Sequence, residues 1–228
     1  MTSGLVQSRL LPGPGQVWTI LVEEIGNGQL LLHTGITLAR ALEGFALAVL
    51  VGIPFAAAMA RSALWRNLFE PIFFFGYPIP KIALFPVFTY VFGIGTPSKV
   101  AFIFLECLYP IVVTCYFGFN GIETRLIWSA RNFGASRSAI LTRVIIPASL
   151  PNIFSGLRVA LPIALIVAVI TEMIGASDGL GYYITIWSTR FAFANVYAAI
   201  IVIGICGFVL DHLLLVARRR GVYWQRET

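Results

Sequence analysis

The residues of this chain that could do chemistry are ionisable side chains within or beside long apolar stretches. Such side chains usually have a function or a paired partner, because an unpaired charge is costly where water is scarce. Glu106 lies inside one apolar run, where it could contact a solute or pair with Lys81 or Arg158. Glu172 ends another run, where it could line a gate or serve only the structure at an aqueous boundary. The candidates for lining a pathway or gate are Glu106, Arg158, Glu172 and Met173.

The chain shows no combination of side chains typical of a catalytic or metal centre. Its two histidines, His33 and His212, are far apart in the sequence. Its cysteines lie within apolar stretches, lack the spacing of metal ligands, and are expected to pack as small hydrophobic residues; they are Cys107, Cys115 and Cys206. We therefore expect no catalytic residue and no metal site, which disfavours an intramembrane enzyme.

One segment, GIGTPSK at residues 93–99, is weakly similar to a phosphate-binding loop. It has no Gly before Lys99, and Val100 stands where a Ser or Thr would bind magnesium. We therefore expect this chain to bind no nucleotide cofactor.

The composition is that of a protein surrounded largely by lipid. Charged residues make up 11% of the chain, against about 25% in an ordinary soluble domain. Five apolar runs are candidates for membrane spans: 44–60, 73–91, 100–121, 159–171 and 191–210; the second is expected to be broken by PIPK at Pro78 to Lys81. Each backbone polar group needs an internal partner in lipid, so the predicted fold class is an all-α, polytopic membrane protein with about five transmembrane helices. The net charge of +6 does not indicate nucleic-acid binding, because the basic residues separate apolar runs and form no single face.

The distribution of Lys and Arg predicts the orientation. These residues cluster at 61–66, at 121–152 and in the C-terminal tail, which lie on one side if the spans alternate. The positive-inside bias places that side in the cytoplasm and the N-terminus outside. The expected division is an extracytoplasmic or interfacial segment at 1–35, a transmembrane domain at 36–218 with a polar loop at 122–152, and a cytoplasmic tail at 219–228. Arg40 and Glu43 are one helical turn apart, so we expect them to pair with each other.

The polar loop begins with the pattern of a short helix. Leu126, Ile127, Ala130 and Phe133 fall at helical spacing. Gly134 can end this helix, because glycine accepts the left-handed backbone of a C-terminal cap. Small residues at 129, 130, 134, 135 and 136 would let another protein approach closely, and aromatic residues such as Trp128 could anchor the contact. The alternative is a solvated loop that serves topology alone.

A second helix is expected after the glycine. Ser136 can cap a helix that starts at Arg137. Pro147 is expected to end that helix, and Pro151 to lie in the first turn of the next span.

These residues resemble the loop signature of the permease subunits of bacterial ABC importers. The matching segment is WSARNFGASRSAILTRVIIP, with Gly134 and Pro147 at the family's spacing. Trp128 and Ser129 depart from the pattern, whose first residue is usually Glu. Other segments resemble the nitrate, sulfonate and taurine type of permease: LARALEGFALAVLVGIPFAAAMA, PIFFFGYPIPKIALFPVFTYVFGIGTPSK and GLRVALPIALIVAVITEMIGASDGLGYYI. The resemblance covers roughly residues 11 to 225.

The resemblance implies a type I, MetI-like importer fold in the bacterial inner membrane, with a cytoplasmic coupling helix around residues 128–133 that sits in a groove of an ATPase. It implies that the coupling residues are Ile127, Trp128, Ser129, Ala130, Phe133, Gly134, Ala135, Ser136 and Pro147. The implied partners are a dimer of ABC ATPase subunits that bind ATP and Mg²⁺, a second permease copy, and an extracytoplasmic solute-binding protein.

The expected function is therefore to form the pathway for a small anionic or zwitterionic solute, such as nitrate, a sulfonate or taurine. The alternative is a secondary transporter or channel without an ATPase, although no internal repeat typical of such proteins stands out. Relatives often carry one more N-terminal span, and this chain is expected to begin near the outer loop that would follow it.

Overall fold

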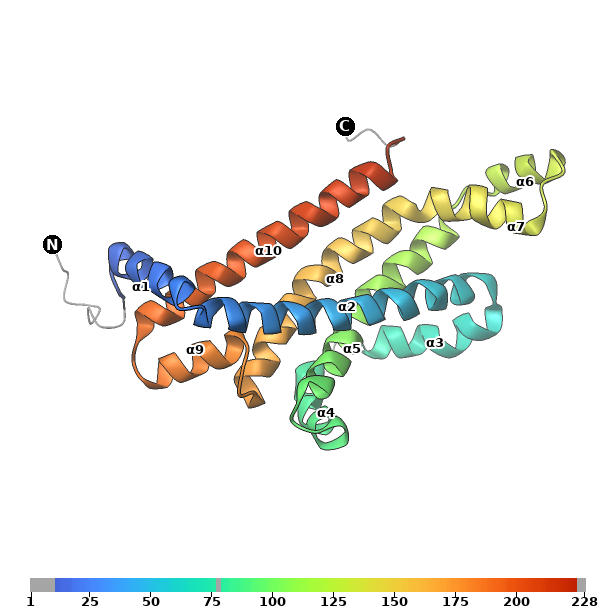
Figure 1. Ribbon diagram of the computed structural model, residues 1–228. Coiled ribbons are helices and arrows are strands. Elements are labelled where there is room, and N and C mark those ends of the chain that lie inside the picture. Colours follow the sequence, from blue (N-terminus) through green and yellow to red (C-terminus); the bar gives the residue numbers. More distant parts are fainter. Residues whose placement is uncertain (1–10, 77–78, 225–228) are drawn as a thin grey trace. The chain divides into compact units, whose positions relative to one another are not determined.

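Every regular element of the structure is a helix within the residues that the computed structural model describes, 11–76 and 79–224 (Figure 1). In chain order they are α1 (Pro14–Gly26), α2 (Gln29–Arg61), α3 (Ala63–Gly76), the 3-10 helix η1 (Lys81–Leu84), α4 (Phe85–Phe92), α5 (Thr96–Asn120), α6 (Thr124–Asn132), α7 (Arg137–Ile140), the π-helix η2 (Leu141–Ile145), α8 (Ile146–Gly175), α9 (Leu180–Thr189) and α10 (Phe193–Gly221). The all-α fold predicted from the composition is confirmed.

The helices long and apolar enough to cross a membrane are, in the described ranges, α2, α5, α10 and the continuous helical stretch Arg137–Gly175 that ends with α8. They cover four of the five predicted spans. The run 73–91 is not one continuous helix, because α3 ends at Gly76 and the chain resumes as η1 and α4. Residues 79 and 80, within the PIPK segment expected to break the run, are not helical. Pro80 lacks an N–H and restricts the residue before it, which opposes a continuous helix here. Pro78, also expected to break this span, lies outside the described residues.

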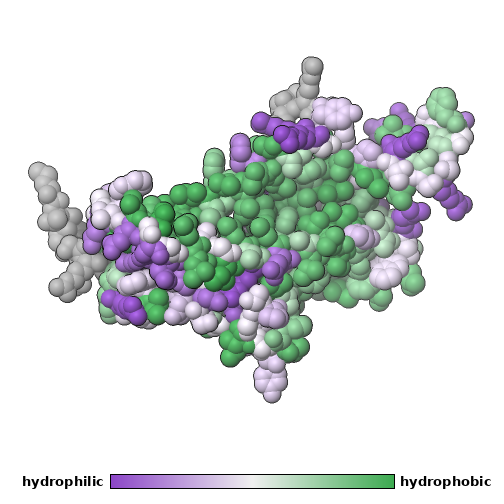
Figure 2. Space-filling model, in the orientation of Figure 1, coloured by the Kyte–Doolittle hydropathy of each residue, from purple (hydrophilic) through white to green (hydrophobic). Residues whose placement is uncertain are grey.

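Apolar side chains line the outer faces of the long helices. Leu50 on α2 is 70% exposed and Ile205 on α10 is 55% exposed. Figure 2 shows hydrophobic residues over much of the visible face of these helices. Hydrophobic surface on this scale suits contact with lipid or with another membrane-embedded chain.

The chain divides into two compact units, and each long helix contributes to both. The first unit comprises the described residues up to Gly44 together with Leu84–Ile103 and Ala164–Val209, and the second comprises Phe45–Ala83, Phe104–Ile163 and the described residues from Leu210. In the first unit, residues of α1, α2, α8, α9 and α10 share an apolar core that includes Val17, Leu30, Tyr183 and Ala199.

In the second unit, α5 and α8 pack closely through small residues. A Cβ atom on Gly118 would lie 2.6 Å from Cβ of Asn152, so only glycine fits there without a shift. The Sγ atom of Cys107 lies 3.4 Å from the carbonyl oxygen of Ala160. Cys107 and Cys115 are fully buried, which agrees with their prediction as core residues.

The polar loop forms α6 and then continues through α7, η2 and α8 without a break. Pro147 was expected to end the second helix and Pro151 to open the next span; both expectations are wrong, because Pro147 lies in the first turn of α8 and Pro151 lies inside it. Pro147 has no N–H and its ring would crowd the carbonyl of Arg143 in a regular α-helix. The wider π-turn directly before α8 gives a physical reason why the helix can continue.

The predicted domain limits remain predictions. The boundary at 35/36 falls inside α2 and that at 218/219 inside α10. Residues 1–10 and 225–228 of the two predicted terminal segments lie outside the described residues.

Candidate functional site: an exposed short helix and the buried charges

The short helix α6 presents aromatic side chains to the surface. Trp128 is 61% exposed and Phe133, at the end of the helix, is 89% exposed. An exposed aromatic pair contributes little to the stability of the chain itself, and aromatic residues of this kind are typical anchors of protein interfaces. The helix contacts α7 and η2, its neighbours within the second unit.

Gly134 fixes where α6 ends. Its φ angle of 78° lies in the left-handed region that favours glycine. Its N–H donates to the carbonyl of Arg131, and the N–H of Ala135 donates to the carbonyl of Ala130. This pair of bonds is a Schellman motif, so the glycine turn predicted from the sequence is confirmed.

Ser136 caps the next helix as predicted. Its hydroxyl accepts a hydrogen bond from the N–H of Ala139 at 3.2 Å. The structure thus brings most of the predicted coupling residues into one continuous segment, α6 and the capped turn: Ile127, Trp128, Ser129, Ala130, Phe133, Gly134, Ala135 and Ser136. Pro147 is half-buried in α8 and lies apart from this segment in the sequence.

In the first unit, Arg40 joins two acidic residues from a distant part of the chain. It donates through Nη1 to Oε1 of Glu172 at 2.9 Å and through Nη2 to Oδ1 of Asp178 at 2.6 Å. Its Nε and Nη2 also donate to Thr96 at 3.2 and 3.1 Å. Every nitrogen of the Arg40 guanidinium is therefore engaged away from Glu43, which is exposed. The expected Arg40–Glu43 pair is wrong, because a buried carboxylate outcompetes an exposed one for a buried guanidinium.

Glu172 is fully enclosed. Its second oxygen accepts from the Thr37 hydroxyl at 2.8 Å and from the N–H of Gly181 at 3.1 Å. Together with Arg40 these donors satisfy the carboxylate, which fits the structural alternative considered for it. The neighbouring Met173 is 45% exposed.

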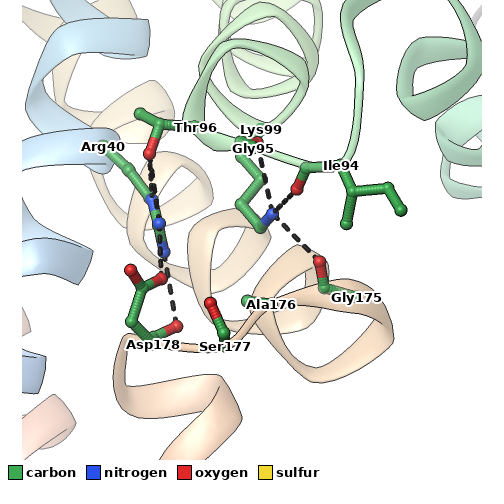
Figure 3. Close-up of a pocket in the computed structure, with 9 residues that line it drawn as sticks. All are labelled: Arg40, Ile94, Gly95, Thr96, Lys99, Gly175, Ala176, Ser177 and Asp178. Carbon is green, nitrogen blue, oxygen red and sulfur yellow. Dashed lines mark hydrogen bonds and ion pairs between the residues drawn. The ribbon is translucent and has the colours of Figure 1, made fainter.

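Lys99 is also buried in the first unit, and its ammonium group donates to backbone carbonyls. Its Nζ donates to the carbonyls of Ile94 at 2.6 Å, Gly95 at 3.3 Å and Gly175 at 3.1 Å. Figure 3 shows this lysine and Arg40 on two sides of an open pocket of about 490 Å³. Its lining residues are Arg40, Ile94, Gly95, Thr96, Lys99, Gly175, Ala176, Ser177 and Asp178. The pocket wall carries two cations and one carboxylate, Asp178, and Arg40 is also paired with Glu172 behind the wall.

Two further ion pairs lie in the second unit. Lys81 Nζ is 3.5 Å from Oε2 of Glu106, which confirms one of the pairings considered for that glutamate. Arg158 makes two bonds to Asp211, at 2.9 and 3.1 Å, with both side chains partly exposed. The sequence suggested Asp211 as a surface or pairing residue without naming this partner.

Comparisons with known proteins agree with this architecture. Residues 32–220 match the family described as "Binding-protein-dependent transport system inner membrane component". A probable ABC transporter permease protein of Brucella abortus is 36% identical over 95% of this chain and 86% of its own length. The taurine transport system permease protein TauC of Escherichia coli is 33% identical over 99% of this chain and 84% of its own length.

The fold is also similar to a solved membrane transporter. A chain of the MetNI methionine ABC transporter, in an inward-facing conformation, matches 94% of this chain and 100% of its own length with a TM-score of 0.68 at 19% identity. The long apolar helices, the family match and the fold agree with one another. This chain therefore belongs to the family of binding-protein-dependent transport system inner membrane components, and it is a multi-pass permease subunit of an ABC importer rather than an enzyme.

Proposed function

We propose that two copies of this chain form the membrane pathway for a small anionic or zwitterionic solute, which a binding protein delivers and an ABC ATPase drives across. The similarity to TauC, whose name assigns it to taurine transport, supports a small solute of this class. ATP and Mg²⁺ are bound by the ATPase subunits. Glu106, Arg158, Glu172 and Met173 are the candidates for the pathway and its gate.

The observation that carries the coupling part of this proposal is the exposed surface of α6. Trp128 and Phe133 present aromatic rings outward, and the Schellman motif at Gly134 fixes the end of the helix that bears them. Aromatic anchors on a rigid support are what a partner protein needs for a well-defined contact. We assign this surface to the ATPase.

The rigidity of the segment matters for energy transfer. To move an equilibrium from 1:99 to 99:1, a ligand must bind one state about 5.5 kcal/mol more tightly than the other. ATP binding and the docked binding protein supply that difference in the proposed cycle. A short helix whose C-terminal end is fixed at Gly134 can pass it from the ATPase to the membrane helices, because it has few other arrangements to relax into.

A substitution at Gly134 tests the proposal. Gly134→Val places a β-branched residue at φ 78°, which disfavours the turn and tilts α6. We expect normal membrane insertion, weaker ATPase association and at least a tenfold loss of ATP-dependent uptake by the reconstituted complex.

Two control variants separate coupling from general strain. Gly134→Asn should retain most activity, because Asn tolerates the left-handed backbone. Gly28→Val introduces the same strain at φ 79° in an equally open place in the first unit, and it should leave ATPase association intact. Normal uptake by Gly134→Val would refute the assigned coupling role of α6.

A further inference from the structure

One ion pair of the second unit lies deep within a membrane span. Glu106 is ten residues from the first residue of α5 and fourteen from the last, so it lies about 15 Å and about 21 Å along the helix from its two ends. Lys81 in η1 reaches it from another part of the chain. Ionisable groups at such depth avoid lipid and face protein or a water-filled space.

This pair is held loosely. Its N···O distance is 3.5 Å, and its side chains remain 20% and 16% exposed. The Arg40–Glu172 pair, in contrast, has a distance of 2.9 Å and side chains that are 5% and 0% exposed. Charge-assisted N–H···O hydrogen bonds are usually about 2.7–2.9 Å long. Replacing one partner of the Lys81–Glu106 pair by a solute group should therefore require less free energy than replacing a partner of the Arg40–Glu172 pair.

An aromatic ring lies beside this pair, and it borders a cavity whose wall includes an acidic residue. The ammonium of Lys81 lies 5.4 Å from the ring centroid of Tyr109. Tyr109 in turn lines a small cavity of about 60 Å³, whose wall also includes Phe73, Tyr116 and the carboxylate-bearing Glu70. Aromatic faces and carboxylates are the groups that recognise ammonium ions.

The charges here discriminate between solute classes. A solute with a net negative charge would meet Lys81 but also the carboxylate of Glu106. A net cation would meet Lys81 as a like charge. A molecule with an acidic group at one end and an ammonium at the other can satisfy both signs at once.

We propose that Lys81, Glu106 and Tyr109 form a solute-holding site on the transport pathway that selects zwitterions carrying a sulfonate or carboxylate and an ammonium group. The sulfonate or carboxylate pairs with Lys81, and the ammonium takes the place of Lys81 at Glu106 and the face of Tyr109. This inference rests on the proposed pathway and names the class of solute it carries. The loose pair suits transport, because a pathway site must release what it binds.

Cysteine labelling of the intact complex in membrane vesicles tests the location of the site. Each variant is built without the native cysteines, and the probes are methanethiosulfonates with an ethylsulfonate or an ethyltrimethylammonium group. Glu106→Cys leaves Lys81 beside the thiol, so the anionic probe should react about fivefold faster than the cationic one, after correction by a neutral probe. Lys81→Cys leaves Glu106, so the preference should reverse.

Cys107 supplies a matched control at the same depth. This neighbour of Glu106 on α5 is fully buried, so a protein that retains Cys107 alone should not react with either charged probe. Failure of both variants to react would refute a water-accessible site, and the same charge preference in both would refute the roles assigned to Lys81 and Glu106.

The solute class is tested with the pair intact. Phe73→Cys places a thiol beside the cavity and keeps Lys81, Glu106 and Glu70 in place. Taurine and β-alanine, as zwitterions, should slow its labelling at least threefold more than isethionate, which lacks the ammonium, or ethanolamine, which lacks the acid. Equal protection by isethionate, or no protection by either zwitterion, would overturn the proposal. Retained ATP-dependent uptake in that case would leave the permease function standing, whereas loss of ATP dependence in the unmodified complex would refute the function itself.

Discussion

Arg40 and Glu172 form a buried ion pair across 132 residues of sequence. Nη1 of Arg40 lies 2.9 Å from Oε1 of Glu172, and the two side chains are 5% and 0% exposed. Two charges taken out of water are stable only while each compensates the other. The pair therefore ties α2 to the end of α8 within the first unit, next to Asp178 in the connection between α8 and α9.

Breaking this pair should destabilise the protein strongly. Glu172→Gln leaves the Arg40 guanidinium with Asp178 as its remaining carboxylate, and removal of one partner of a buried ion pair costs up to about 3–5 kcal/mol. We expect a marked drop in the thermal unfolding temperature of the purified protein in detergent. Glu43→Gln is the matched control, because Glu43 lies on the same helix, is exposed and is not the partner of Arg40; it should leave the unfolding temperature unchanged. A larger effect of Glu43→Gln than of Glu172→Gln would contradict the observed pairing.

The double variant Arg40→Met/Glu172→Met tests whether the two charges depend on each other. The double variant leaves no buried guanidinium that has lost its buried carboxylate partner, so it should be more stable than Glu172→Gln alone. Asp178 loses its partner but has a side chain that is 41% exposed, which gives it access to water. If the loss in free energy of unfolding of the double variant equals the sum of the losses of its two single variants, the two residues act independently.

Gly181 should tolerate no side chain. A Cβ atom there would clash with the carbonyl oxygen of Val169 and would lie 2.7 Å from Cβ of Glu172. Gly181→Ala must therefore push α9 away from α8, and we expect a loss of about 1–3 kcal/mol in the free energy of unfolding. Gly204→Ala on α10 is the control, since a Cβ atom added at Gly204 would meet nothing within 4 Å; it should be neutral or slightly stabilising. Equal unfolding temperatures for the two variants would contradict the close packing.

The exposed aromatic ring of Phe133 should matter for assembly and not for folding. Phe133→Ser removes a side chain that is 89% exposed, so the unfolding temperature of the permease alone should be unchanged. Association with the ATPase should weaken about tenfold or more if the ring is an interface anchor. Tyr90→Ser, at an aromatic residue of α4 that is 93% exposed, is the control and should not affect ATPase binding. Equal affinities of both variants in a pull-down titration would speak against an anchor at position 133.

Features encoded by neighbouring residues could be predicted from the sequence. The turn at Gly134 and the cap at Ser136 each depend on residues within one helical turn, so local rules were sufficient. Four of the predicted spans are helices for the same reason, since length and apolar composition determine them.

Features that depend on distant residues could not be predicted in this way. The partners of Arg40 lie 132 and 138 residues away, and no spacing rule selects them over Glu43. The helix through Pro147 could not be predicted either, although the residues involved are close in the sequence. A proline normally interrupts an α-helix, and the π-turn of η2 that accommodates it has no simple signature in the sequence.

Site-specific photo-crosslinking from position 133 tests the central claim most directly. A benzophenone-bearing residue at position 133 should crosslink to the ATPase subunit of the assembled importer, and the same group at position 90 should not. The yield from position 133 should also differ between nucleotide-free and ATP-bound complexes if α6 transmits the motion of the ATPase. A crosslink to the ATPase from position 90 and none from position 133 would contradict the account.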